Sequence, residues 1–247
     1  MMRCSLACGA LVVALLGPPA PPAAAQGSFD GLVVYKVSDA DGKSGLMRYY
    51  QLGTRTRQEF EMNGVAAVSI FDGTTGDILT LMPQHKQYLV MNMKQLGQHM
   101  GEMAQALQGQ KGATGDLSKM KVTATGKSET IAGISCEHFL FASTDEGSHG
   151  PVDVCGATGM GFMGVGDQAS SAMPSTAGLL HSSNPDLARL ARAGFFPLKI
   201  TTPEGAGGKS AVFEATQVDR QRPDAALFQP PAGYTKLTLP AMPGMKP

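Results

Sequence analysis

Two cysteines, Cys136 and Cys155, flank a polar segment with two glycines, and this arrangement constrains the fold more than any other feature of the chain. Apolar runs lie on both sides of the segment at 144–150, which is the pattern of a β-hairpin with a long loop. Opposed residues of an antiparallel pair can meet the roughly 4.4 to 6.8 Å between Cα atoms that a disulfide needs. We therefore predict a disulfide between directly opposed cysteines, with strands at about 134–141 and 150–157.

The start of the chain has the pattern of a secretory signal peptide. Arg3 leads into an apolar run at 5–17, which is followed by Ala23-Ala24-Ala25. The apolar run is shorter than the roughly 20 residues that a membrane-spanning helix needs, so we expect no transmembrane segment in the mature chain. Residues 1–25 are thus predicted to be cleaved after Ala25, and the protein to be periplasmic or secreted.

Export bears directly on the hairpin cysteines. The other two cysteines leave with the signal, and the remaining pair favours a disulfide in an oxidising compartment. The alternative is a metal site formed by Cys136, His138 and Cys155, with His138 opposite Asp153 in the predicted register. Because this spacing matches no standard zinc pattern, a His–Asp pair across the strands is the preferred interpretation.

Charge and motifs exclude several function classes. Lys and Arg number 20, and Asp and Glu also number 20, so no electrostatic argument favours nucleic acid or an anionic membrane. The G-x-G-x-x-G string at 159–164 follows a hairpin strand and does not open a βαβ unit. The chain contains neither G-x-S-x-G nor H-E-x-x-H, and its five histidines are scattered. We expect no cofactor and no enzymatic activity.

Short apolar runs separated by turn signals predict an antiparallel meander at 31–93. Asn63-Gly64 is its strongest two-residue hairpin signal. The row Arg55, Arg57, Glu59 and Glu61 is interpreted as a solvated strand face. The strands expected in this region are 32–37, 46–51, 55–62, 65–71, 78–82 and 87–93. Further strands are predicted at 119–125, 196–202 and 210–218, and Pro197 suggests that its strand lies at an edge of the sheet.

Two helices are predicted to cover this sheet. The first has one apolar stripe and the second has an N-cap, an N-terminal proline and a C-terminal glycine. The stripe consists of Leu96, Met100, Met103 and Leu107, and the second helix is marked by Asn184, Pro185, Leu187, Leu190 and Gly194. We predict one mainly β domain at 26–239, a strongly curved antiparallel sheet or half-barrel of about ten or eleven strands with two covering helices. A long loop at 156–178 and a disordered tail at 240–247 complete the expected chain.

A curved sheet closed by helices can leave an apolar cleft, and methionine-rich walls adapt to flexible ligands. The residues expected to line such a cleft are Val68, Ile70, Leu89, Met91, Met100, Met103, Leu187 and Leu190. Thioethers also select Cu(I), so a copper site built from these methionines and His99 is the alternative. Packing of the methionines as apolar lining is the preferred interpretation.

Several segments together resemble domain-of-unknown-function family 4412. They are 29–31, Arg57 and Glu59, 70–72, 82–88, the turn and strand at 130–137, 194–199, and the ending at 227–234. The resemblance implies an exported bacterial protein. This family is distantly similar to half-barrel carriers of periplasmic lipoproteins, which hold acyl chains in a sheet covered by helices. Family 4412 supplies no catalytic residues that could be assigned to this chain.

Three functions remain open at this point. The first is a periplasmic protein that binds or carries an apolar or lipid-like ligand. The second is an exported metal-binding protein that uses Met and His, and the third is a structural or partner-binding envelope protein without a small ligand. The similarity to half-barrel carriers favours the first.

Overall fold

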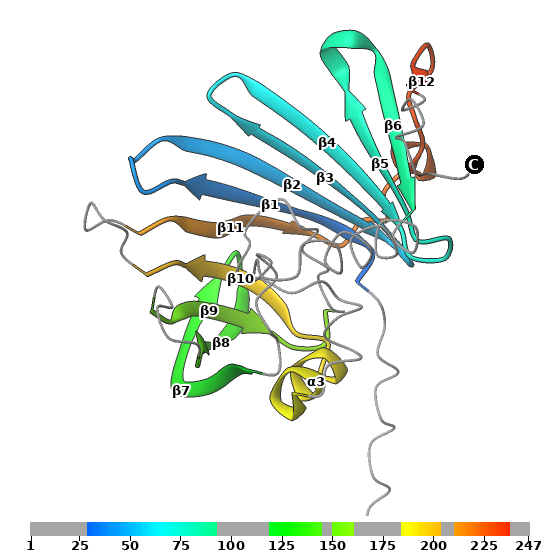
Figure 1. The fold of residues 1–247 in the computed structure, drawn as a ribbon. Helices are drawn as coiled ribbons and strands as arrows, with labels where there is room; N and C mark the ends of the chain where they lie inside the picture. The colour runs from blue at the N-terminus through cyan, green and yellow to red at the C-terminus, as the bar shows by residue number, and fades with distance from the viewer. Residues whose placement is uncertain (1–28, 93–118, 145–149, 161–183, 204–209, 238–247) are drawn as a thin grey trace, which may run out of the picture.

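The structure is a computed structural model that describes residues 29–92, 119–144, 150–160, 184–203 and 210–237 (Figure 1). The predicted signal peptide, the first predicted helix, most of the loop at 156–178 and the tail at 240–247 lie outside these residues. Those predictions are therefore not tested by the structure.

A single sheet of twelve strands forms the described part of the protein. Its strand order is β12-β6-β5-β4-β3-β2-β1-β11-β10-β9-β8-β7. The strands are β1 (Gly31–Ser38), β2 (Ser44–Leu52), β3 (Arg55–Met62), β4 (Val65–Asp72), β5 (Asp77–Met82), β6 (Gln87–Asn92), β7 (Met120–Ile131), β8 (Ile134–Ser143), β9 (Val152–Ala157), β10 (Phe196–Thr201), β11 (Val212–Asp219) and β12 (Thr235–Leu237). The predicted mainly β, curved architecture is confirmed, with more strands than the expected ten or eleven. The unexpected strand is β12, which pairs in parallel with β6.

Two-residue turns set the register of the hairpins. Asn63 and Gly64 both have positive φ, 53° and 76°, as the turn between β3 and β4 requires. The two strands begin and end where the sequence predicts, within one residue. Ala132 and Gly133 make the same kind of turn between β7 and β8, with φ of 48° and 79°. The two strands of this hairpin therefore pair directly from Ile131 and Ile134 onward.

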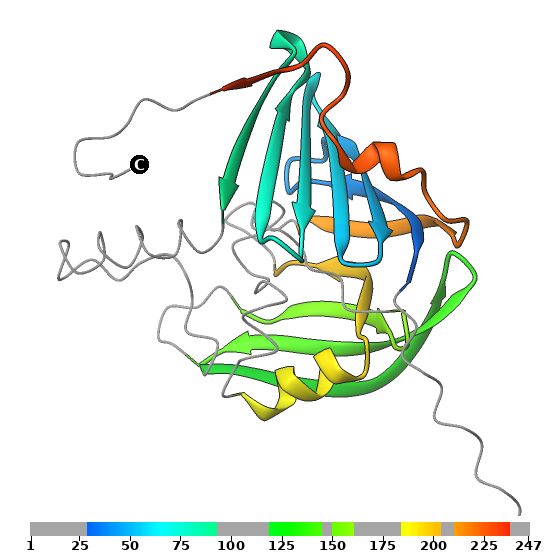
Figure 2. The ribbon, with the colours of Figure 1, turned by 90° about the vertical axis from the view of Figure 1, so that its right-hand side faces the viewer.

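The sheet bends sharply where β10 leaves β11. These strands pair only from Lys199 to Thr201. On the other side of β10, its pairing with β9 has a bulge between Pro197 and Lys199. The start of β10 instead contacts β1 and β2: the Tyr35 hydroxyl donates to the Pro197 carbonyl at 2.7 Å, and the rings of Tyr49 and Phe196 lie 5.7 Å apart. The strands on either side of this point therefore lie at an angle to each other (Figures 1 and 2).

The prediction that Pro197 marks an edge strand is wrong, because β10 lies between β9 and β11. The short pairing between β10 and β11 explains how an interior strand accepts proline. Pro197 has no N–H to donate, and at this position β11 is not paired with it.

Alternation along the strands gives the sheet two faces. We call the face that carries Tyr35 and Tyr49 the inner face, and the face that carries Arg57 and Ile70 the outer face. The register continues each face across the sheet. For example, Val37, Phe213, Ile200, Val154 and Phe139 are opposite one another in turn and all lie on the inner face.

One α-helix, α3 (Pro185–Arg192), is present in the described residues and packs on the inner face of β8 to β10. The predicted N-cap is confirmed, since the Asn184 side chain accepts hydrogen bonds from the backbone N–H groups of Asp186 and Leu187. Leu187 and Leu190 are buried against Phe139 and Phe141. The predicted second helix is thus present, with its apolar stripe in the core.

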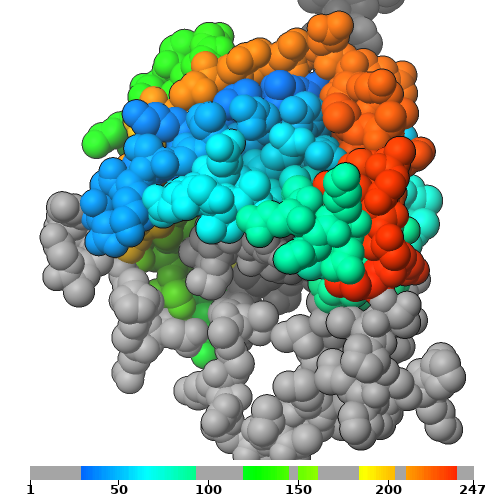
Figure 3. Space-filling model, turned by 90° about the horizontal axis from the view of Figure 1, so that it is seen from above, coloured from blue at the N-terminus to red at the C-terminus, as the bar shows by residue number. Residues whose placement is uncertain are grey.

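The C-terminal segment covers the outer face of β3 to β6. It contains the short helix η3 (Ala225–Phe228), and Phe228 packs with Leu52, Ile70 and Leu81. Seen from above, this orange and red segment lies against the cyan strands (Figure 3). The outer face of β3 to β6 is therefore closed by residues near the C-terminal end of the sequence.

Candidate functional site

The disulfide between Cys136 and Cys155 is present, with 5.4 Å between the Cα atoms. Both cysteines are buried, at 2% and 1% exposure. The predicted register of the hairpin is wrong by two residues, because Cys155 lies opposite His138 and Asp153 lies opposite Leu140. The disulfide therefore joins diagonal neighbours on the outer face of β8 and β9.

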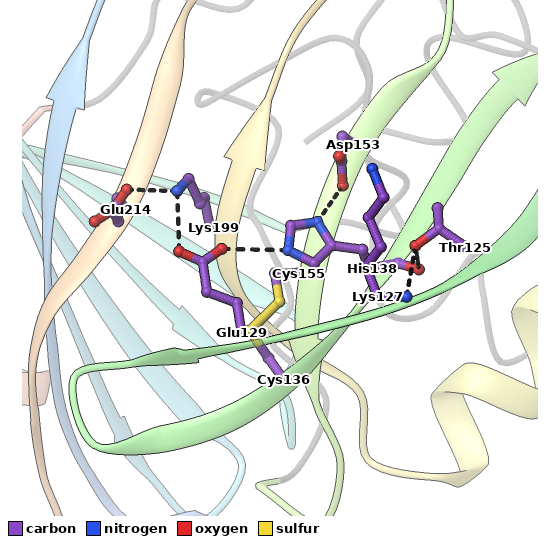
Figure 4. The surroundings of a disulfide bond; sticks show 9 residues. All are labelled: Thr125, Lys127, Glu129, Cys136, His138, Asp153, Cys155, Lys199 and Glu214. Carbon is purple, nitrogen blue, oxygen red and sulfur yellow. Dashed lines mark hydrogen bonds and ion pairs between the residues drawn. A yellow bond between two sulfur atoms is a disulfide. The ribbon is translucent and has the colours of Figure 1, made fainter.

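A chain of charged side chains covers the disulfide (Figure 4). His138 Nδ1 lies 2.8 Å from Asp153 Oδ1, and His138 Nε2 lies 3.2 Å from Glu129 Oε2. The other oxygen of Glu129 accepts a hydrogen bond from Lys199 Nζ at 3.3 Å, and Lys199 lies 3.0 Å from Glu214. The predicted contact between His138 and Asp153 is confirmed as a diagonal pair. Five neighbouring strands, β7 to β11, each contribute one residue to this chain.

The alternation of the strands explains why these polar groups gather. On β8 and β9 the outer face carries Cys136, His138, Asp153 and Cys155. Phe139, Phe141 and Val154 alternate with them and pack in the apolar cluster under α3. Glu129 is opposite Cys136, and Lys199 is opposite both Cys155 and Glu214. The hydrogen bond to Glu214 is the main cause that raises the pKa of Lys199, and partial burial opposes it.

Three potential metal ligands converge here. The ligand atoms of Glu129, His138 and Cys155 lie within 4.8 Å of one another. While the disulfide is closed, Cys155 offers no thiolate, and thiolate is the form of cysteine that binds metal. The oxidised site therefore holds only a histidine and carboxylates.

The structure does not bring the predicted cleft residues to one surface. Val68 and Ile70 lie on the outer face and pack in the cluster under η3. Leu89 and Met91 lie on the inner face, because Leu89 is opposite Thr80 and Thr80 is opposite Ser69. Leu187 and Leu190 pack between α3 and the sheet. Met100 and Met103 lie outside the described residues, as does His99, so the copper alternative is also not tested.

The inner face of β3 to β6 carries apolar residues, among them Phe60, Phe71 and Ile78, which were not predicted from the sequence. Phe71, Ile78 and Met91 are opposite one another on three successive strands, with Phe60 and Leu89 on the same face. All five are half-buried. Counting the register through each hairpin would have separated this set from Val68 and Ile70.

The charged row on β3 is not a solvated face, contrary to the prediction. The side chains of Arg57 and Glu59 are 11% and 23% exposed and pair at 2.8 Å. Arg55 lies over the ring of Phe228. The covering segment is distant in sequence, so local alternation gave no sign of it.

The sequence of the chain matches the domain of unknown function DUF4412 over residues 29–234. The chain belongs to this family. The matched region runs from the start of β1 through η3, so the DUF4412 region includes both the disulfide hairpin and the covering C-terminal segment.

None of the curated proteins matches this DUF4412 chain. Among solved structures, it is similar to an uncharacterized conserved protein from Thermus thermophilus, with 10% sequence identity and a TM-score of 0.46. The similarity covers 84% of this chain and 90% of that chain. Within the described ranges, no helix combines the length and apolarity needed to cross a membrane.

Proposed function

We propose that this DUF4412 protein is an exported, non-enzymatic binding protein for an apolar or lipid-like ligand held against the inner face of β3 to β6. The distribution of charge on these strands carries the proposal. All of their charged residues, which are Arg55, Arg57, Glu59, Glu61, Asp72 and Asp77, lie on the outer face. The inner face carries only apolar and neutral polar residues, including Phe60, Phe71, Ile78, Leu89 and Met91.

The chemistry of this face favours a flexible, uncharged chain. Aromatic and aliphatic groups supply contact area, and the thioether of Met91 adapts to irregular shapes. Ser69 and Thr80 lie opposite each other in the same face and offer hydroxyl groups to a polar substituent. The ligand expected from this surface is a fatty-acyl chain with its charged end directed away from the strands.

The test is titration of the purified protein with a fluorescent fatty acid. We expect saturable binding that an unlabelled fatty acid displaces. Met91→Glu places a charge at the end of the row formed by Phe71, Ile78 and Met91. It should weaken binding by at least about tenfold, since an unpaired charge against apolar groups is costly. Leu46→Glu is the matched control, because Leu46 is exposed and lies on the outer face.

Two results would overturn this proposal. One is probe binding that appears only after the protein is destabilised, which indicates exposed core and not a site. The other is equal affinity of the Met91→Glu and Leu46→Glu variants, both folded by circular dichroism. Export is tested separately: the protein recovered from the cell envelope should have the mass of a chain that starts at Gln26.

A further inference from the structure

The pair formed by His138 and Glu129 has the spacing of two ligands on one metal ion. Zinc bonds of about 2.0 to 2.2 Å to nitrogen and oxygen in a tetrahedron separate the two ligand atoms by roughly 3.3 Å. His138 Nε2 and Glu129 Oε2 lie 3.2 Å apart. An ion can therefore replace the contact between these atoms with little movement of either side chain.

Groups outside the pair already orient both ligands. Asp153 Oδ1 contacts His138 Nδ1 at 2.8 Å, which leaves Nε2 for a metal. Lys199 Nζ donates to Glu129 Oε1, which leaves Oε2 for a metal. Carboxylates behind metal-binding histidines fix the orientation of the ring and raise its basicity. This outer shell is complete in the structure.

The sulfur of Cys155 lies on the protein side of the same pair. Its ligand atom is within 4.8 Å of those of His138 and Glu129, and Cys136 is bonded to it. The cysteines are buried, whereas the side chains of His138 and Glu129 are 17% and 38% exposed. The imidazole and the carboxylate are thus the ligand groups that solvent reaches, while the sulfur atoms lie in the buried cluster that contains Ile131 and Ala157.

We propose that reduction of this disulfide turns the site into a zinc site with Cys155, His138 and Glu129 as ligands and Cys136 as the fourth. A dithiol reductant supplies two electrons and two protons by thiol–disulfide exchange and is itself oxidised to a disulfide. Zn²⁺ then displaces the two thiol protons and binds the thiolates. The proposal does not depend on the apolar ligand described above.

Charge and ligand type select this ion. The carboxylates of Glu129 and Asp153 contact His138 directly, so negative charge lies beside the imidazole before any thiolate forms. Thiolate, imidazole and carboxylate together form a donor set that zinc accepts in four-coordinate sites, whereas Mg²⁺ and Ca²⁺ prefer oxygen alone. Because only the reduced form binds zinc, the ion should also make the disulfide easier to reduce.

The experiment compares oxidised and reduced full-length protein without oxygen. The protein is reduced with a small dithiol, desalted, and titrated with Zn²⁺ against a chromophoric chelator. We expect one zinc per reduced chain and no stoichiometric binding by the oxidised chain. Co²⁺ added to the reduced protein should give thiolate-to-metal charge-transfer absorption, which reports the sulfur ligands directly.

Variants that keep the disulfide test the other ligands. His138→Gln and Glu129→Gln should each weaken zinc binding by more than about tenfold, and Asp153→Asn by about 10 to 100-fold. His85→Gln, on the exposed turn between β5 and β6, is the matched control and should bind like the unmodified protein. Circular dichroism is recorded on every sample. A parallel set of samples receives zinc before reduction, so that a fold that depends on the metal is preserved.

Three results would overturn the proposal. The first is a reduced protein that holds no stoichiometric zinc, whether zinc is added before or after reduction. The second is an oxidised protein that binds zinc as tightly as the reduced one, which would show that the sulfur atoms are not ligands. The third is an affinity of both His138→Gln and Glu129→Gln equal to that of His85→Gln, which would show that zinc binds the cysteines elsewhere or in an unfolded chain.

Discussion

Arg57 Nη1 donates a hydrogen bond to the backbone oxygen of Leu227 at 2.8 Å, across 170 positions of sequence. The same guanidinium donates from Nε to Glu59 at 2.8 Å. Arg57 therefore joins the middle of β3 to the turn η3, while Phe228 beside it fills the outer apolar cluster. This contact attaches the C-terminal segment to the outer face of β3 to β6, the face that carries all the charged residues of these strands.

Replacement of Arg57 should loosen this segment. Arg57→Lys keeps the charge but cannot donate to Glu59 and Leu227 together, because lysine lacks the planar fork of arginine. We expect a loss of about 1 to 3 kcal/mol in the free energy of unfolding, the usual range for a hydrogen bond from a charged group in a half-buried site. Chemical denaturation measures it, with Arg222→Lys as the exposed control. Equal stability of the two variants would contradict the attachment.

Removal of the disulfide should destabilise the protein clearly. The cysteines are 19 residues apart, and closing a loop of this size stabilises by roughly 3 kcal/mol in the chain-entropy model. Cys136→Ser should therefore lower Tm, and reduction of the unmodified protein should lower it by a similar amount. The check is thermal unfolding with and without reductant. A thiol that alkylates in the untreated native protein would show that the bond is not formed.

The sequence was informative wherever the decisive contact was local. Asn63-Gly64 predicted the β3–β4 hairpin within one residue, and Asn184 with Pro185 predicted the start of α3. These signals act through the backbone of a few adjacent residues, so they are visible in any short window. The two cysteines also predicted their bond, since the strands that bring them together adjoin one another.

Relations between strands were harder to predict. Val68 and Leu89 each alternate cleanly along their own strand, but the lengths of the turns decide which face of β4 continues on β6. A change of one residue in register exchanges the faces, so apolar residues grouped by strand alone were placed on one surface when they lie on two. The bulge at Pro197 and the parallel strand β12 left no local pattern. Both depend on tertiary contacts of neighbouring strands.

Gly156 is expected to be intolerant of any side chain. A Cβ at this position would lie 2.0 Å from the ring of Phe195, which packs on β9 beside α3. Gly156→Ala should therefore cost about 1 to 3 kcal/mol through overpacking. The measurement is a double-mutant cycle with Phe195→Leu, which makes room. If the two changes prove additive, the ring is not the cause of the constraint.

Alkaline pH should unfold the protein through two buried tyrosines. Burial raises the pKa of Tyr49 and of Tyr35 well above the ordinary value of 10.0, so both stay protonated in the folded state. In the unfolded chain they ionise above about pH 10, so the folded state then holds more protons and stability falls as pH rises. Below that pH their contribution is constant.

Each tyrosine should add about 1.4 kcal/mol per pH unit to this loss above its unfolded pKa. Tyr49→Phe removes one titrating group and should make the decline shallower by that amount. At neutral pH the same variant loses the hydrogen bond from the Tyr49 hydroxyl to Gln51 Oε1 and should be less stable by about 1 kcal/mol. The two effects have opposite signs, so the stability curves of variant and unmodified protein should converge as pH rises. Denaturant unfolding at a series of pH values measures both curves, and parallel curves would show that Tyr49 does not couple folding to proton binding.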